Sequence, residues 1–179
     1  MFKKDPRHAA FAASLCVAAW LAPALAHANT GMITFNGQLT DSTCEVRGGL
    51  TGLPSFVVEL PTLSASQLRK NEIAGRTLFR MQLENCSALA NGVRVFFENG
   101  PQVDRFTGTL VTTIPSVHFA LFNHDGSPIE IGQESQRTTN MLYQANDVMH
   151  YQVAYRNMGD VDAVAGMVAA SVTYSLDYP

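Results

Sequence analysis

The chain has 179 residues, of which 46% are hydrophobic and 15% are charged. This length corresponds to about one domain and excludes a large multidomain enzyme, and the hydrophobic content is high enough to build a packed core. With 12 basic and 15 acidic residues the formal net charge is −3. A nucleic-acid-binding protein would show a clustered basic excess, which this sequence lacks.

The first 28 residues have the layout of a secretory signal peptide. Basic residues within the first seven positions precede an apolar run over 9–25, and the small-residue pattern Ala26-His27-Ala28 follows. We therefore predict that residues 1–28 are removed and that residues 29–179 form one mature domain. A retained membrane anchor is the alternative, because about 17 apolar residues are marginal for crossing roughly 30 Å of hydrocarbon.

Two cysteines remain after the predicted cleavage, Cys44 and Cys86. In an exported chain a pair of cysteines is expected to form a disulfide. A bridge between them closes a loop of about 43 residues, which the chain-entropy treatment values at roughly 4 kcal/mol. A redox or metal pair would require much shorter spacing.

The mature chain is predicted to consist of short strands separated by turns. Ser64–Ile73 is the only stretch with a helical pattern, and Asp125-Gly126 is a hairpin signal. Apolar residues alternate with polar ones in five stretches and also form a short run at Phe56–Leu60. The alternating sets are Ile33, Phe35 and Leu39; Phe79, Met81 and Leu83; Val93, Val95 and Phe97; Val117, Phe119 and Leu121; Met149, Tyr151, Val153 and Tyr155. Such a pattern in one domain predicts an all-β antiparallel sandwich.

The end of the chain carries the longest alternation. Eleven residues to Tyr178 place one apolar face at Val168, Ala170, Val172, Tyr174, Leu176 and Tyr178. Chain termini usually fray. A long terminal strand that ends in an aromatic residue therefore predicts that something outside the domain covers this edge.

Four stretches in this order resemble the subunits of chaperone-usher fimbriae, the adhesive pili of Gram-negative bacteria. They are Gly31-Met32-Ile33-Thr34-Phe35-Asn36-Gly37 before Cys44; Val57-Val58-Glu59-Leu60-Pro61 with Ala74-Gly75-Arg76-Thr77-Leu78-Phe79; Leu83-Glu84-Asn85-Cys86; and Gly166 with penultimate Tyr178. Each motif alone is weak, but the ordered set behind a signal peptide is specific. Within the family, the chain looks most like a major or shaft subunit.

The resemblance implies an incomplete immunoglobulin-like β-sandwich that lacks its last strand. A periplasmic chaperone would cap the resulting groove, and at the outer-membrane usher a donor strand from the next subunit would replace the chaperone. The groove and chaperone-binding residues would be Gly166 and the apolar face from Val168 to Tyr178. The donor residues would be Met32, Ile33 and Phe35. The subunit would reach the cell surface in a fimbrium that supports attachment to a host or surface receptor, with no cofactor, metal or catalytic site.

The sequence departs from shaft subunits at its mature N-terminus. Shaft subunits commonly carry about ten or more residues before the glycine motif, whereas only Asn29 and Thr30 precede it here. Nine extended residues, 29–37, would span about 30 Å. We expect a short-extension variant, and a tip subunit that does not need to donate a strand is the alternative.

Two other classes of function remain as alternatives. One is a self-sufficient secreted β-sandwich that binds carbohydrate. The other is a small exported metalloenzyme that uses His118, His124 and His150, although no metal-ligand spacing supports it. The strand alternation places His118 and His150 opposite their apolar neighbours and predicts ordinary surface histidines.

Overall fold

A computed structural model describes residues 43–87, 89 and 91–179. All of the described residues belong to one compact unit, Leu39–Pro179. The predicted signal peptide and the predicted donor residues Met32, Ile33 and Phe35 lie outside the described residues. No helix in the described part of the chain is long and apolar enough to cross a membrane.

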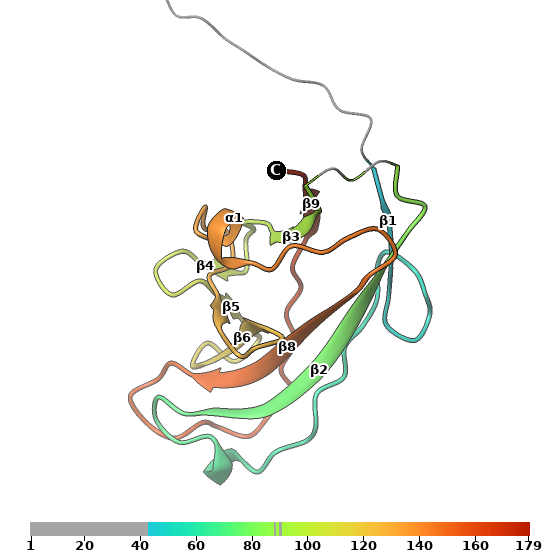
Figure 1. Ribbon diagram of the computed structural model, residues 1–179. Helices are drawn as coiled ribbons and strands as arrows, with labels where there is room; N and C mark the ends of the chain where they lie inside the picture. Colours follow the sequence, from blue (N-terminus) through green and yellow to red (C-terminus); the bar gives the residue numbers. More distant parts are fainter. Residues whose placement is uncertain (1–42, 88, 90) are drawn as a thin grey trace, which may run out of the picture. The chain divides into compact units, whose positions relative to one another are not determined.

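One large antiparallel sheet dominates the domain. Its strand order is β1-β2-β8-β6-β5-β4, with β7 paired to β6. The two longest strands, β2 and β8, run side by side (Figure 1). The strands are β1 Glu45–Gly48, β2 Ile73–Glu84, β4 Val103–Asp104, β5 Thr109–Val111, β6 Val117–Asn123, β7 Pro128–Ile129 and β8 Val148–Asn157.

A second, small sheet pairs β3 (Arg94–Phe97) with β9 (Tyr174–Asp177). A single 3-10 turn, η1 (Ala65–Gln67), falls within the stretch predicted to be helical. A short helix, α1 (Gln136–Thr139), was not predicted, because four residues give no helical period. Buried Gln136 holds α1 against β3, since its side chain accepts a hydrogen bond from Phe97 N–H and donates one to Phe97 C=O.

The core contains the faces that alternation predicted on β2, β3, β6 and β8. Tyr151 is fully buried, and its ring centroid lies 5.7 Å from that of Phe79 and 5.5 Å from that of Phe97. Since aromatic rings bury large apolar areas, this cluster joins the two sheets. Fully buried members are Met81, Leu83, Val93, Val95, Ile131, Met149 and Tyr151.

The predicted hairpin at Asp125-Gly126 is confirmed between β6 and β7. Gly126 has a φ of 86°, a left-handed conformation that glycine adopts without strain. The Asp125 carboxylate accepts hydrogen bonds from the backbone N–H and the hydroxyl of Ser127, and these bonds lower its pKa.

Two expectations need correction. The predicted eleven-residue terminal strand is wrong in extent. Its burial alternates from Val168 to Leu176, but only β9 pairs with another strand, because β3 is four residues long. His118 is not a surface residue, being 6% exposed. It lies opposite its apolar neighbours as predicted, but Thr109 on β5 covers it, with the hydroxyl 2.7 Å from Nδ1.

Candidate functional site

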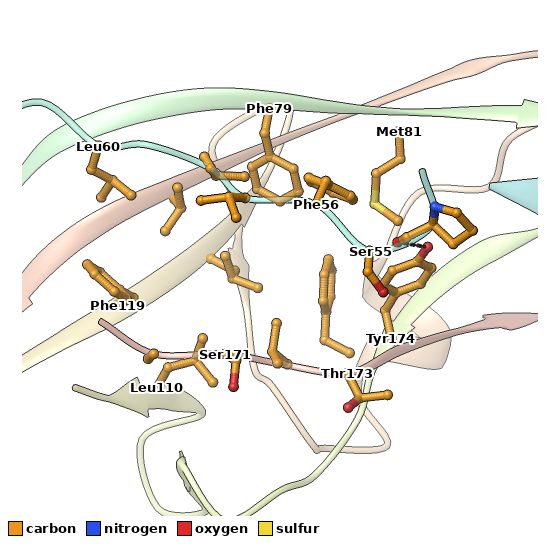
Figure 2. Close-up of a pocket in the computed structure, with 18 residues that line it drawn as sticks. Ser55, Phe56, Leu60, Phe79, Met81, Leu110, Phe119, Ser171, Thr173 and Tyr174 are labelled. Atoms are coloured by element: carbon orange, nitrogen blue, oxygen red, sulfur yellow. Dashed lines mark hydrogen bonds between the residues drawn. The ribbon is translucent and has the colours of Figure 1, made fainter. Parts of the chain in front are cut away.

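The main candidate site is a groove of about 680 Å³ that opens onto the hydrophobic core. Figure 2 shows two extended segments on either side of it, one carrying Phe56 and Leu60 and the other carrying Ser171 and Thr173. Its floor consists of core side chains from five strands. These floor residues are Phe79, Met81, Phe97, Leu110, Phe119, Leu121 and Val153.

The first wall is the segment 54–60, which we call the upstream wall. Phe56, Val58 and Leu60 are half-buried and pack against the core, whereas Val57 between them is 76% exposed. This is the alternation of a strand. Residues 55–60 nevertheless make no backbone hydrogen bond to another described residue.

The second wall is the segment 168–174, which we call the terminal wall. On its far side, Glu98 N–H donates to Thr173 C=O at 2.8 Å, and Ser171 N–H donates to the Gln102 side chain at 2.9 Å. The backbone groups of Ala170 and Val172 make no hydrogen bond to any described residue. Within the described part of the chain, the sandwich therefore has an unpaired backbone edge beside a groove that reaches the core.

Tyr174 closes one end of the groove. Its hydroxyl donates a hydrogen bond to Pro54 C=O at 2.8 Å and so joins the two walls (Figure 2). Burial raises the pKa of the Tyr174 phenol, which keeps the donor proton in place at physiological pH.

At its other end, the groove borders a second cavity of about 440 Å³. The two cavities share Leu60 in their linings, and the second also contacts Val168. Ala163 N–H closes the far end by donating to Leu68 C=O at 3.2 Å. An extended peptide laid between the walls would have apolar pockets along its whole length.

The chain end beyond the groove is anchored by ion pairs. Arg94 Nε lies 3.0 Å from Asp177 Oδ2, and Arg137 pairs with the other carboxylate oxygen. The side chains of Arg94 and Asp177 are only 10% and 18% exposed, so this pair is poorly screened by solvent. Asn91 also donates a side-chain hydrogen bond to the C=O of Pro179.

The predicted disulfide between Cys44 and Cys86 is present and lies next to this anchor. It ties the start of the described chain to the segment after β2. Cys44 and Cys86 both pack against the same core as the terminal residues.

The structure gathers most of the predicted groove residues on one face. Val168, Ala170, Val172, Tyr174, Leu176 and Tyr178 are all half-buried and pack against the core. Gly166 is exposed, and a β-carbon there would lie 2.8 Å from Ile114 Cδ1, so a larger residue would crowd the wall.

The upstream wall was not predicted from the sequence as part of the site. Phe56, Val58 and Leu60 contribute as much to the groove as the terminal residues do. Their alternation before Pro61 was a usable signal. It did not reveal that this segment and the terminal wall line the same groove, because separation in space is not encoded in a local pattern.

The residues considered for catalysis do not converge. No group of three or more histidine, cysteine or acidic side chains suited to holding a metal occurs among residues 43–87, 89 and 91–179. The His124 and His150 rings lie 5.4 Å apart on the surface, while His118 is buried next to Thr109. The described geometry thus favours a binding groove over a reactive centre.

Comparisons with known proteins agree with this geometry. Residues 33–179 match the family described as fimbrial protein. The F17 fimbrial protein of Escherichia coli is 34% identical, with 83% of this chain and 87% of that protein covered. The major fimbrial subunit SMF-1 of Stenotrophomonas maltophilia is 33% identical, with 88% and 97% covered.

Solved pilus structures share the fold. A structure of a chaperone-usher pilus that addresses rod uncoiling has a TM-score of 0.59 and 19% identity, and covers 88% of this chain and all of that one. The P pilus rod subunit PapA has a TM-score of 0.56 and 18% identity, and covers 83% of this chain and all of its own. The expected all-β, incomplete immunoglobulin-like sandwich is confirmed.

Proposed function

Because the chain belongs to the fimbrial protein family and is a structural subunit of a fimbrium, we propose that its groove holds one extended β-segment supplied by a neighbouring subunit. The observation that carries this proposal is a pair of walls whose backbone groups toward the groove have no partner among the described residues. Residues 55–60 and the pair Ala170 and Val172 make no backbone hydrogen bond to any described residue, and they line a groove that reaches the core.

A β-strand suits this groove better than any compact ligand. Unpaired N–H and C=O groups on a strand edge bind another extended backbone, and alternating pockets select its side chains. The groove is long and apolar and is bounded at one end by Tyr174 and Pro54. A donated strand would pair with one or both walls and complete the sandwich.

The donor segment in this proposal is residues 29–37 of the next subunit. Ile33 and Phe35 alternate in phase and would fill pockets over the floor, with Met32 on the other side. Nine extended residues reach about 30 Å, so a short extension can still occupy the main cavity. Donation from each subunit to the next gives a head-to-tail filament that does not close on itself.

Before assembly, a periplasmic chaperone would cover the same groove. The chaperone strand would pair with the terminal wall. The whole chaperone-binding surface would also include Gly166 before this wall and the apolar face that continues to Tyr178. An open groove exposes core and an unpaired edge, both of which promote aggregation, so the uncapped subunit should not accumulate. The outer-membrane usher would then exchange the chaperone strand for the donor strand, and the filament would support attachment to a receptor.

A self-sufficient carbohydrate-binding sandwich is the competing function. Such a module would complete its own core, and here the groove reaches the floor residues Leu110 and Phe119 directly. The exported chain also retains no tryptophan if cleavage follows residue 28, since Trp20 lies in the predicted signal peptide.

Expression in a periplasm with and without the matching chaperone tests the proposal. Residues 29–179 should accumulate only with the chaperone, as a one-to-one complex. The matched control is residues 38–179, which lacks the donor segment. It should still form the chaperone complex but fail to extend filaments. Stable monomer without the chaperone, or normal filaments from the truncated chain, would contradict the proposal.

A further inference from the structure

The outer face of the large sheet carries a row of arginines that have no carboxylate partner among the described residues. Nine Lys and Arg side chains occur within the described residues, and four of them lie within 4.0 Å of a carboxylate. Of the five without such a partner, Arg76, Arg80 and Arg156 lie on β2 and β8. The other two are Arg69 and Arg105, which lie elsewhere.

The strand register puts these three arginines on one face. Arg80 pairs with His150, and Arg156 pairs with both Ile73 and His118. Arg76 contacts Phe122, which belongs to the small cluster of Ala120, Phe122 and Ala154 on this same side of the sheet. At the ordinary rise of a strand, the span from residue 73 to residue 80 is roughly 23 Å, so the three charges form a stripe along the strands.

Arg76 is held in place within the stripe. Its guanidinium carbon lies 3.8 Å from the Phe122 ring centroid, and its Nη1 donates to Gln152 Oε1 at 3.2 Å. Gln152 in turn donates to His124 C=O at 3.1 Å. A guanidinium fixed in this way keeps free N–H groups and loses little entropy when it pairs with a planar anion.

This face is independent of the groove. The groove floor is formed by Phe79, Val153 and Phe119, which alternate with the outer residues on the same strands. Filling the groove with a strand therefore leaves the arginine stripe unaltered. Three nearby carboxylates already have other partners: Glu84 pairs with Arg47, Asp125 accepts hydrogen bonds from Ser127, and Asp104 accepts one from Phe106 N–H.

We propose that the stripe of Arg76, Arg80 and Arg156 binds a linear acidic polysaccharide, through its sulfate or carboxylate groups. The chain has a formal net charge of −3, so most of its surface does not attract anions. The arginine stripe is a local exception, and its extended shape favours an extended anion. A nucleic acid fits less well, because Phe122 is 5% exposed and covered by Arg76, which leaves no aromatic ring on this face for base stacking. Three charges per subunit give weak binding, which repetition along a filament strengthens.

Purified filaments of the full chain test this assignment. Surface plasmon resonance would measure binding to immobilised dextran sulfate, to alginate and to uncharged dextran at 50 and 150 mM NaCl. The wild type should bind one or both charged polysaccharides, more weakly at the higher salt concentration, and should not bind dextran. Comparing the binding response to dextran sulfate with the response to alginate shows whether the stripe recognises sulfate or carboxylate groups.

Matched variants locate the binding face. Arg80→Gln with Arg156→Gln should lower the apparent affinity at least tenfold, whereas Arg69→Gln with Arg105→Gln, which changes the net charge equally, should stay within twofold. Electron microscopy would verify that both variants assemble, and Arg80→Gln alone serves if the double variant does not. Equal losses in both pairs, no binding by the wild type, or equally strong binding to duplex DNA would overturn the proposal.

Discussion

The backbone N–H of Cys44 donates a hydrogen bond to the phenol oxygen of Tyr178 at 2.8 Å, across 134 positions of sequence. Cys44 is also bonded to Cys86, so the disulfide and the penultimate residue form one structural unit. The same end of the chain is held by Asp177 against Arg94. The terminal wall of the groove is thus fixed at its C-terminal end, while farther upstream the backbone of Ala170 and Val172 has no hydrogen-bond partner among the described residues.

Tyr178 is expected to act through both its ring and its hydroxyl. Tyr178→Phe removes one hydrogen bond and should cost about 1 kcal/mol of subunit stability, with filaments still formed. Tyr178→Ala also removes the packed ring and should cost about 3 kcal/mol and strongly reduce surface filaments. Immunoblotting of sheared filaments measures the yield. Equal yields from Tyr178→Ala and the wild type would argue against the terminal-wall assignment.

The disulfide is expected to be a structural requirement. Replacing Cys44 and Cys86 together by serine should destabilise the subunit by roughly 4 kcal/mol, because the unfolded chain regains the entropy of an open loop. Yield in the periplasm, compared with the wild type in the same strain, measures the effect. A double variant that accumulates normally and melts at the wild-type temperature would contradict this role.

The partly buried carboxylate of Asp177 should matter more than an exposed one. Asp177→Asn leaves Arg94 without its carboxylate in a site where that side chain is 10% exposed, at a cost of about 3 kcal/mol. Asp160→Asn is the matched control, because its pair with Lys70 is exposed and should contribute less than about 1 kcal/mol. Melting temperatures of the two chaperone complexes compare them. Equal shifts would show that burial of the pair is irrelevant.

His118 should make the subunit less stable in acid. Desolvation by burial lowers the pKa of His118 below its ordinary value of 6.5, with Arg156 acting in the same direction, while Asp104 and the Pro115 carbonyl oppose the shift. The unfolded state therefore binds more protons, so the stabilisation is complete above about pH 6.5 and is lost as the pH falls through and below that value.

Urea denaturation of the chaperone complex at pH 7.5 and 5.0 measures this pH effect. The wild type should lose stability on acidification, and His118→Gln should lose less, because glutamine can keep a polar contact with Thr109 without titrating. An identical pH dependence in the two proteins would exclude His118 as the source.

Local alternation predicted much of this fold. The core faces of β2, β6 and β8 follow directly from residues such as Met81, Phe119 and Tyr151, because side chains two positions apart share a face of a strand. The terminal alternation from Val168 to Tyr178 also predicted the buried face correctly. It overestimated the length of β9, because a strand is defined by its hydrogen-bonded partner and the sequence does not encode where a partner is missing.

The remainder depends on distant contacts. Phe56 and Ala170 line the same groove because of the sheet topology, which no local pattern specifies. His118 is buried because β5 brings Thr109 over it. The stripe of Arg76, Arg80 and Arg156 likewise follows only from the register of β2 with β8.

Hydrogen exchange measured by mass spectrometry on assembled filaments tests the central claim most directly. The amides of residues 55–60, Ala170 and Val172 have no acceptor among the described residues of their own subunit. If a neighbour fills the groove, amides on the wall or walls that pair with it should exchange in filaments as slowly as those of β2 and β8. Exchange within seconds along both walls in intact filaments would contradict the account.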